Sequence, residues 1–224
     1  MYLQFSTEQQ QGGIYVSKSS AKTRRTLRLT QLSVLVALLI IFGFTSIGYI
    51  KIGVIEITLN VIPVAVGAVV LGPYAGAICG AVFGLTSFWQ AASGTSAFGA
   101  MLFQHSPVST FILCFVPRLL VGLLTALVFK AMMKACKNNN SVPCATASLC
   151  CPLFNTLLFV GSFILLFMKT DIFSGLYTQS AANSIAAFFV WFVGLNGLIE
   201  AIAGFIIATA VSKALLIANK KLTL

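Results

Sequence analysis

Two ionisable residues, Arg118 and Glu200, lie deep within long apolar stretches of the sequence. A charged side chain at a lipid-exposed helix centre costs about 2.5–3.5 kcal/mol on insertion scales, so each must find a polar partner. At 1.5 Å of rise per residue, both fall past the middle of a membrane, within about 6 Å of depth of each other. A salt bridge between Arg118 and Glu200 is therefore geometrically possible.

Two asparagines extend this polar set. Asn196 precedes Glu200 by four residues and shares its helix face, and Asn155 lies at a compatible depth in another apolar stretch. Polar groups from three helices can thus meet inside a bundle. They indicate either a ligand site, in which Arg118 faces an anionic or carbonyl group, or a buried network that fixes helix register.

Further candidate ligand contacts lie nearer the expected outer surface, where Trp and Tyr are also common as interfacial anchors. These polar and aromatic residues are Asn60, Trp89, Gln90, Gln104, His105, Tyr177, Gln179 and Asn183.

The sequence lacks the usual patterns of catalytic and metal chemistry. Glu200 is the only acidic residue in an apolar stretch, and no GxSxG or GxxxxGK[ST] motif occurs. His105 is the only histidine, and the six cysteines form no CxxC pair. We therefore expect no enzyme activity, no metal site, no cofactor and no ATP hydrolysis by this chain.

The composition requires a membrane. Of the 224 residues, 58% are hydrophobic and 8% are charged, whereas a soluble domain carries roughly 25% charged residues. The net charge of +10 comes from basic clusters between apolar runs, a pattern that sets membrane topology and does not indicate nucleic-acid binding.

Apolar stretches of about 20 residues predict an all-α integral membrane protein, a compact bundle of six transmembrane helices. With the N-terminus inside, eleven Lys and Arg residues face the cytosol and two, Lys51 and Lys169, face outward, which places both termini in the cytosol. Residues 1–28 and 218–224 are expected to be cytosolic basic tails flanking a membrane domain of residues 29–217. The expected helices are 29–47, 58–71, 73–91, 107–134, 144–168 and 184–216.

Small residues recur every four positions in two of these helices. Gly76, Gly80 and Gly84 form one ridge, and Ser33 and Ala37 form a second small face. Such ridges let helix backbones approach closely. They predict either packing within the protein or docking on a partner subunit.

Several segments together resemble the substrate-binding (S) subunit of energy-coupling factor (ECF) vitamin transporters, over about residues 28–216. The VPR of helix four and the FNT of helix five are most similar to the pantothenate-type branch. In the first helix, this chain has Ser33-xxx-Ala37 where the family usually has Ala-xxx-Ala. The segments are TLNVIPVAVGAVVLG (58–72), PYAGAICGAVFGLTSF (73–88), VPRLLVG (116–122), FNTL (154–157) and NGLIE (196–200).

The resemblance implies a subunit of the bacterial cell membrane that captures a vitamin outside, under a lid around residues 49–57. It then docks through small-residue faces on a transmembrane coupling subunit driven by two ATPases. Pantothenate offers a carboxylate for Arg118 and amide and hydroxyl groups for the asparagines. The expected substrate-binding set is Arg118, Asn155, Asn196, Glu200, Asn60, Trp89, Gln90 and His105, and the expected docking set is Ser33, Ala37, Gly76, Gly80 and Gly84.

Two alternatives stay open at this stage. A riboflavin- or cobalamin-type S subunit would share the fold, and its ring ligand would rely more on Trp89, Phe103 and Tyr177. A stand-alone small secondary transporter or channel subunit would need charge relays, for which one arginine and one glutamate are few.

Overall fold

The computed structural model describes residues 24–45, 48–52, 55–136, 141–181 and 183–222. Side chains are described throughout these ranges except at 49–52, 55–57, 192–196, 198 and 220–222. Most of the expected N-terminal tail, residues 1–23, lies outside them. The first helix is already formed at Arg24, and the last continues to Leu222, so helix extends into both expected tails.

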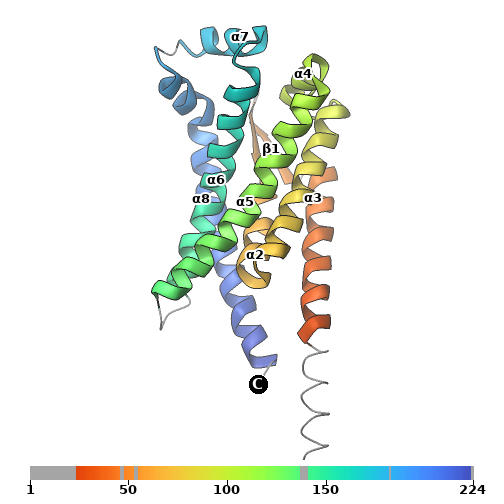
Figure 1. Cartoon of the computed structure of the whole chain (residues 1–224), viewed down its shortest axis with the longest axis vertical. Helices are drawn as coiled ribbons and strands as arrows, with labels where there is room; N and C mark the ends of the chain where they lie inside the picture. Colours follow the sequence, from red (N-terminus) through yellow and green to blue (C-terminus); the bar gives the residue numbers. More distant parts are fainter. Residues whose placement is uncertain (1–23, 46–47, 53–54, 137–140, 182, 223–224) are drawn as a thin grey trace, which may run out of the picture.

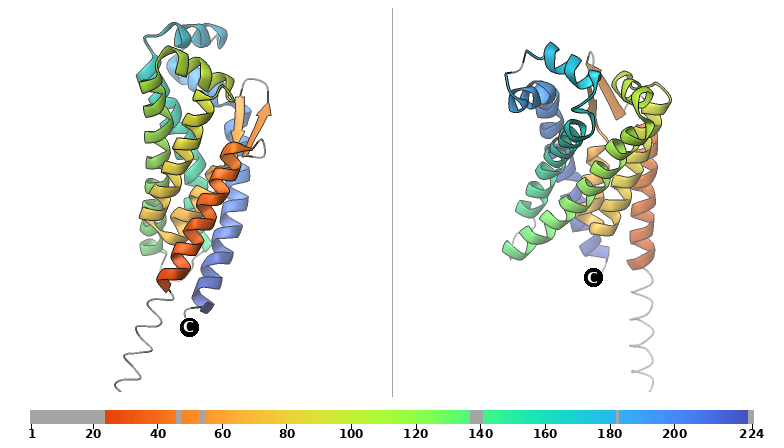
Figure 2. Two further views of the ribbon diagram at one scale, coloured as in Figure 1. Left: turned by 90° about the vertical axis from the view of Figure 1, so that its right-hand side faces the viewer. Right: turned by 45° about the horizontal axis from the view of Figure 1, so that its top comes forward.

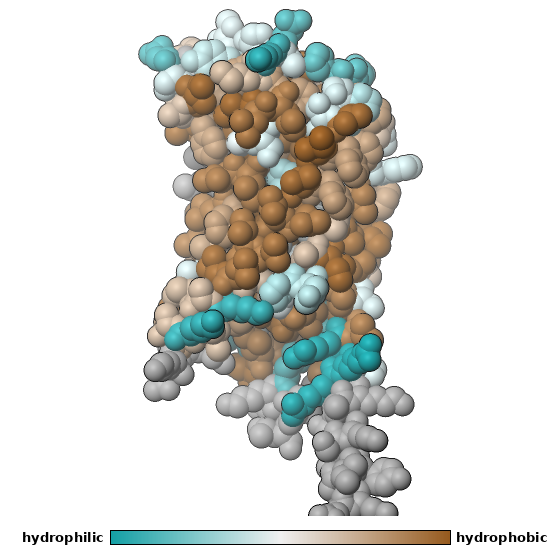
Figure 3. Space-filling view, viewed as in Figure 1, coloured by the Kyte–Doolittle hydropathy of each residue, from teal (hydrophilic) through white to brown (hydrophobic). Residues whose placement is uncertain are grey.

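Five helices in the described ranges are long and apolar enough to cross a membrane. The face of the molecule in Figure 3 is hydrophobic over its middle and hydrophilic at both ends. The structure thus supports a helical membrane protein with five candidate spans. These spans are the first helix (Arg24–Phe44), α3 (Pro73–Ala92), α5 (Pro107–Ala135), α6 (Ser141–Phe167) and the 199–219 part of α8 (Ile185–Leu222).

The expected second span is shorter than predicted. Helix α2 covers only Val61–Leu71, which is 11 residues, or about 16 Å at 1.5 Å per residue. Residues 55–58 of the preceding segment form a strand instead, since β-branched Ile and Thr favour extended backbone. Hydropathy counted these residues toward a helix. Helix α2 is therefore shorter than the five candidate spans, and the count of six crossings stays a prediction.

A two-stranded hairpin precedes α2 and is an addition to the helical fold that the sequence predicts. Strands β1 (Tyr49–Ile52) and β2 (Ile55–Thr58) pair antiparallel, with Tyr49 opposite Thr58. The Leu59 N–H donates to the Gly48 carbonyl at 2.9 Å and extends the pairing past the strand end. This hairpin occupies the segment that the family resemblance assigns to a lid.

Two connections between the expected helices contain short helices. Helix α4 (Ala97–His105) begins where the Ser96 side chain accepts a hydrogen bond from the Gly99 N–H. Helix α7 (Asp171–Gln179) begins at Thr170 in the same way. Both lie at the end of the molecule opposite the C-terminus (Figure 1).

Helix α2 is the centre of the core. Most of its residues are buried, and it packs against α3, α5, α6 and α8. A helix that is apolar on all sides is expected to be enclosed in this way. Gly72, at φ +94°, provides the left-handed turn into Pro73, the first residue of α3.

Helices α3 and α5 pack backbone against backbone along the glycine ridge. A Cβ atom on Gly80 would collide with the Arg118 carbonyl, and one on Gly76 would collide with Gly122. Gly84 faces Phe115 in the same way. The ridge is therefore used for packing within the protein, which is one of the two uses expected from the sequence. A role of Gly76, Gly80 and Gly84 in docking a partner stays a prediction.

The first helix packs loosely by comparison. Only 17% of the apolar stretch that could cross the membrane in this helix is buried inside the protein. The Gln31 side chain donates to Asn219 at 2.7 Å and receives a second bond from it at 3.3 Å. This reciprocal amide pair joins the first helix to the end of α8, and the two run side by side in Figure 2.

We predict that Gly80→Ala lowers the stability of the protein by about 1–3 kcal/mol, the usual cost of overpacking. Thermal unfolding in detergent measures the effect. Gly161→Ala on α6 is the matched control, because nothing lies within 4 Å of the added Cβ there. Equal melting temperatures for the two variants would contradict the close α3–α5 contact.

A buried polar cluster as the candidate functional site

Arg118 is anchored by a carbonyl that a proline leaves free. Pro117 lies inside α5 and has no N–H, so the carbonyl of Leu113, four residues earlier, lacks its helical donor. The Arg118 Nη1 donates to this carbonyl at 2.8 Å. A helix defect therefore becomes the acceptor that orients the guanidinium.

Two aromatic rings hold the same guanidinium. Its central carbon lies 4.2 Å from the ring centre of Phe159 on α6 and 5.5 Å from that of Phe83 on α3. Cation–π contact of this kind stabilises a desolvated cation, and Arg118 is only 8% exposed. A planar guanidinium fixed by a backbone bond and two rings is suited to recognition of a carboxylate.

Asn155 and Glu200 form a second buried contact. Asn155 on α6 donates through Nδ2 to the Oε1 atom of Glu200 on α8, at 3.0 Å. The two side chains are 7% and 9% exposed. The positive charge of Arg118 also acts on the Glu200 carboxylate. In the hydrogen bonds described above, however, Arg118 donates to Leu113 and Glu200 accepts from Asn155.

The end of the hairpin joins this cluster. The backbone of Thr58 lies close to the Glu200 carboxylate, and β2 lies against α8. Asn60 follows directly, fully buried, at the start of α2. Its N–H donates to the Thr58 hydroxyl at 3.3 Å. The structure thus brings Arg118, Asn155, Glu200 and Asn60 into one buried region.

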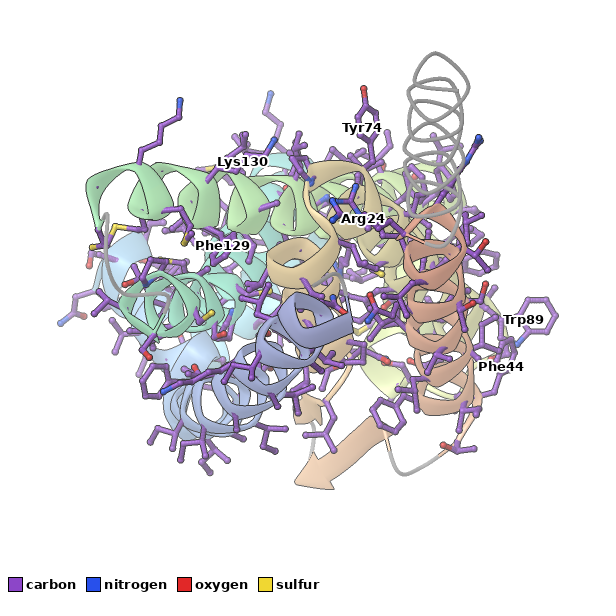
Figure 4. The ribbon with its side chains drawn as sticks, turned by 90° about the horizontal axis from the view of Figure 1, so that it is seen from below. Arg24, Phe44, Tyr74, Trp89, Phe129 and Lys130 are labelled. Carbon is purple, nitrogen blue, oxygen red and sulfur yellow. The ribbon has the colours of Figure 1, made fainter. Side chains whose placement is uncertain are left out.

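Other residues of the predicted set lie elsewhere. Gln90 is buried, and its Nε2 donates to the Gly43 carbonyl at 2.6 Å, which joins α3 to the first helix. Trp89 is 58% exposed beside Phe44, and both point outward at the periphery in Figure 4. His105 is exposed at the end of α4. The side chain of Asn196 lies outside the described residues.

Sequence reasoning missed the residues that support the cluster. Phe159 follows Asn155 by four residues, so it shares the same face of α6. Pro117 directly precedes Arg118, and its effect on the Leu113 carbonyl was readable from the spacing. Phe83 and Thr58 gave no local signal, because their contacts are set by tertiary packing.

The described residues contain no group of three or more His, Cys, Asp or Glu side chains that could hold a metal ion. The polar groups that meet in the core are instead a guanidinium, a carboxylate and amides. They can bind a polar organic solute through charge and hydrogen bonds. The fold and these contacts define a membrane protein of several apolar helices with a buried cluster of polar groups.

Comparison with known proteins identifies the class more closely. Residues 27–212 match the family model described as the ECF transporter, substrate-specific component. The chain belongs to this family, which is a transporter family and not an enzyme family.

Two curated relatives carry a more specific description. The chain is 28% identical to the "Pantothenate transporter PanT" of Leuconostoc mesenteroides over 178 residues, which covers 75% of this chain and 81% of the relative. It is 34% identical to the "Pantothenic acid transporter PanT" of Lactococcus lactis over 167 residues, which covers 70% of this chain and 76% of the relative.

We predict that the energetic effects of Pro117 and Arg118 substitutions are coupled. Arg118→Ala leaves the Leu113 carbonyl without its donor, which costs about 1–3 kcal/mol for a buried group. In a Pro117→Ala background, the new alanine N–H takes that carbonyl, so the same substitution costs less. A double-mutant cycle on thermal unfolding measures the coupling, and strictly additive effects would contradict the anchoring role of Pro117.

Proposed function

We propose that this protein is the substrate-capture subunit of an ECF-type vitamin transporter and that its solute is pantothenate. The observation that carries the proposal is the buried guanidinium of Arg118, held by Leu113 and Phe159, whose charge acts on Glu200 of the Asn155–Glu200 pair. The two relatives named as pantothenate transporters support the choice of solute.

Pantothenate matches the chemistry of this cluster. Its carboxylate pairs with Arg118 in a site of low dielectric, where a charge pair is stronger than in water. Its hydroxyl and amide groups find hydrogen-bonding partners in Asn155 and Asn60, with Asn196 expected to contribute from α8. A neutral solute of the same size would offer no charge for the guanidinium to pair with.

We further propose that the subunit works with a transmembrane coupling subunit and two ATPases. The matched family is described as a substrate-specific component, which implies further components, and the sequence has no phosphate-binding loop of the GxxxxGK[ST] kind. Ser33 and Ala37 are both exposed on the first helix. This small face is available for close approach by another helix.

We propose a cytoplasmic location for both termini in a bacterial cell membrane. Arg24 starts the first helix and Lys130 lies near the end of α5, at the end of the molecule where the C-terminus lies (Figure 1). Lys213 lies in the last part of α8, toward the same end. Basic residues at one end of a bundle favour the cytosolic side.

The first test is equilibrium binding of a vitamin panel to the purified chain in detergent, without partner subunits or ATP. We expect pantothenate to bind and riboflavin and cobalamin not to bind. Arg118→Ala should weaken binding at least tenfold, since truncating one partner of a buried charge pair costs about 2–5 kcal/mol. Binding of another vitamin alone would refute the solute assignment, and binding of none by a folded sample would refute solute capture.

The second test separates docking from capture. Ala37→Leu should reduce pantothenate uptake by cells or proteoliposomes that carry the complete transporter, because a larger side chain prevents close helix approach. Affinity for pantothenate in detergent should stay unchanged. Leu38→Phe enlarges a different face of the same helix and should leave uptake intact. Equal loss of uptake and affinity in Ala37→Leu would contradict a docking role.

A further inference from the structure

The Asn155 side chain uses one of its two polar groups within the protein. Its Nδ2 donates to Glu200, whereas its buried Oδ1 has no hydrogen-bond partner among the described residues. The residue is only 7% exposed. A buried amide oxygen without a donor is costly, so such groups are usually satisfied by a ligand or by water.

Glu200 determines which polar atom of the Asn155 amide stays available to a solute. The Oε1 atom of Glu200 accepts in this contact, so Asn155 turns its NH2 group toward it. Rotating the amide by 180° would place two acceptors, Oδ1 and Oε1, against each other. The contact therefore fixes Oδ1 as the group that faces away from α8.

Glu200 is itself held in place from the hairpin. In an antiparallel pair, successive N–H groups point to opposite sides of a strand. The Leu59 N–H points to the carbonyl of Gly48, just before β1, so the Thr58 N–H points away from β1, on the side where the Glu200 carboxylate lies close. The carboxylate thus connects β2 on one side with Asn155 on the other.

We propose that Glu200 is a positioning residue rather than a solute contact. It holds Asn155 so that Oδ1 accepts a hydrogen bond from a hydroxyl or amide N–H of the solute. The site then reads the two parts of a solute separately: Arg118 requires an anion, and Asn155 requires a hydrogen-bond donor. The identity of that solute as pantothenate rests on the function proposed above.

The four-variant test exploits the near-equal shapes of carboxylate and amide. Glu200→Gln keeps an oxygen that can accept from Asn155 but turns its NH2 group toward the Thr58 N–H, so pantothenate affinity should fall by less than in Glu200→Leu. Glu200→Leu removes the acceptor and frees the amide, and affinity should fall at least tenfold. Asn155→Asp places two carboxylates together and should reduce affinity at least as much.

The double variant Asn155→Asp with Glu200→Gln reverses the hydrogen bond. The glutamine NH2 now donates to the aspartate, its oxygen accepts from Thr58, and the second aspartate oxygen faces the solute. Affinity should recover at least tenfold relative to Asn155→Asp alone. If Glu200 contacts the solute through its charge, Glu200→Gln will lose as much affinity as Glu200→Leu and the double variant will not recover, which would overturn the proposal.

The same four variants are also compared without solute, by thermal unfolding in detergent. The melting temperature lost in Asn155→Asp should return in the double variant. The melting temperatures are measured without solute, so they test the Asn155–Glu200 pairing alone. Failure of the wild-type chain to bind pantothenate, by contrast, refutes only the solute assignment. Absence of any recovery in melting temperature refutes the Asn155–Glu200 pairing, whatever the solute is.

Discussion

A membrane protein must satisfy its backbone polar groups internally, because lipid offers no hydrogen bonds. Pro117 breaks this rule at one carbonyl, and the Arg118 side chain repairs it. The repair fixes a cation in the core, where Phe83 and Phe159 then stabilise it from α3 and α6. The position of the charge thus follows from a backbone constraint, and the remaining polar groups of the site are arranged around it.

The short helix α2 determines where Asn60 and the end of the hairpin lie within the bundle. A helix of about 16 Å reaches only part of the way across about 30 Å of hydrocarbon. Its first turn, with Asn60, therefore lies within the bundle, and the hairpin end at Thr58 meets Glu200 there. The glycine contacts between α3 and α5 bring the backbone of Arg118 directly against Gly80. Close helix packing and a half-length helix together set the depth of the site.

Hydropathy and depth counting predicted five of the spans, and they brought Arg118, Asn155 and Glu200 to one region. They did not distinguish the strand at residues 55–58 from helix, because hydropathy does not report backbone conformation. The spacing of the glycine ridge predicted a close helix contact but did not identify the helix in contact, and the structure shows that Gly80 packs against α5. Trp89 faces outward for a similar reason, since the direction of a side chain around its helix depends on neighbours distant in sequence. The resemblance to S subunits came from the order of weak segments and agrees with the family match.

The central claim is that Arg118 recognises the carboxylate of the solute. The most direct measurement compares the affinities of pantothenate and of its alcohol analogue, in which the carboxylate is replaced by CH2OH, for the wild-type chain and for Arg118→Gln. The account predicts that the wild-type chain prefers the acid by at least roughly tenfold, as expected for a buried charge-assisted pair, and that Arg118→Gln loses the preference while still binding the alcohol. An unchanged preference for the acid in Arg118→Gln would contradict the account.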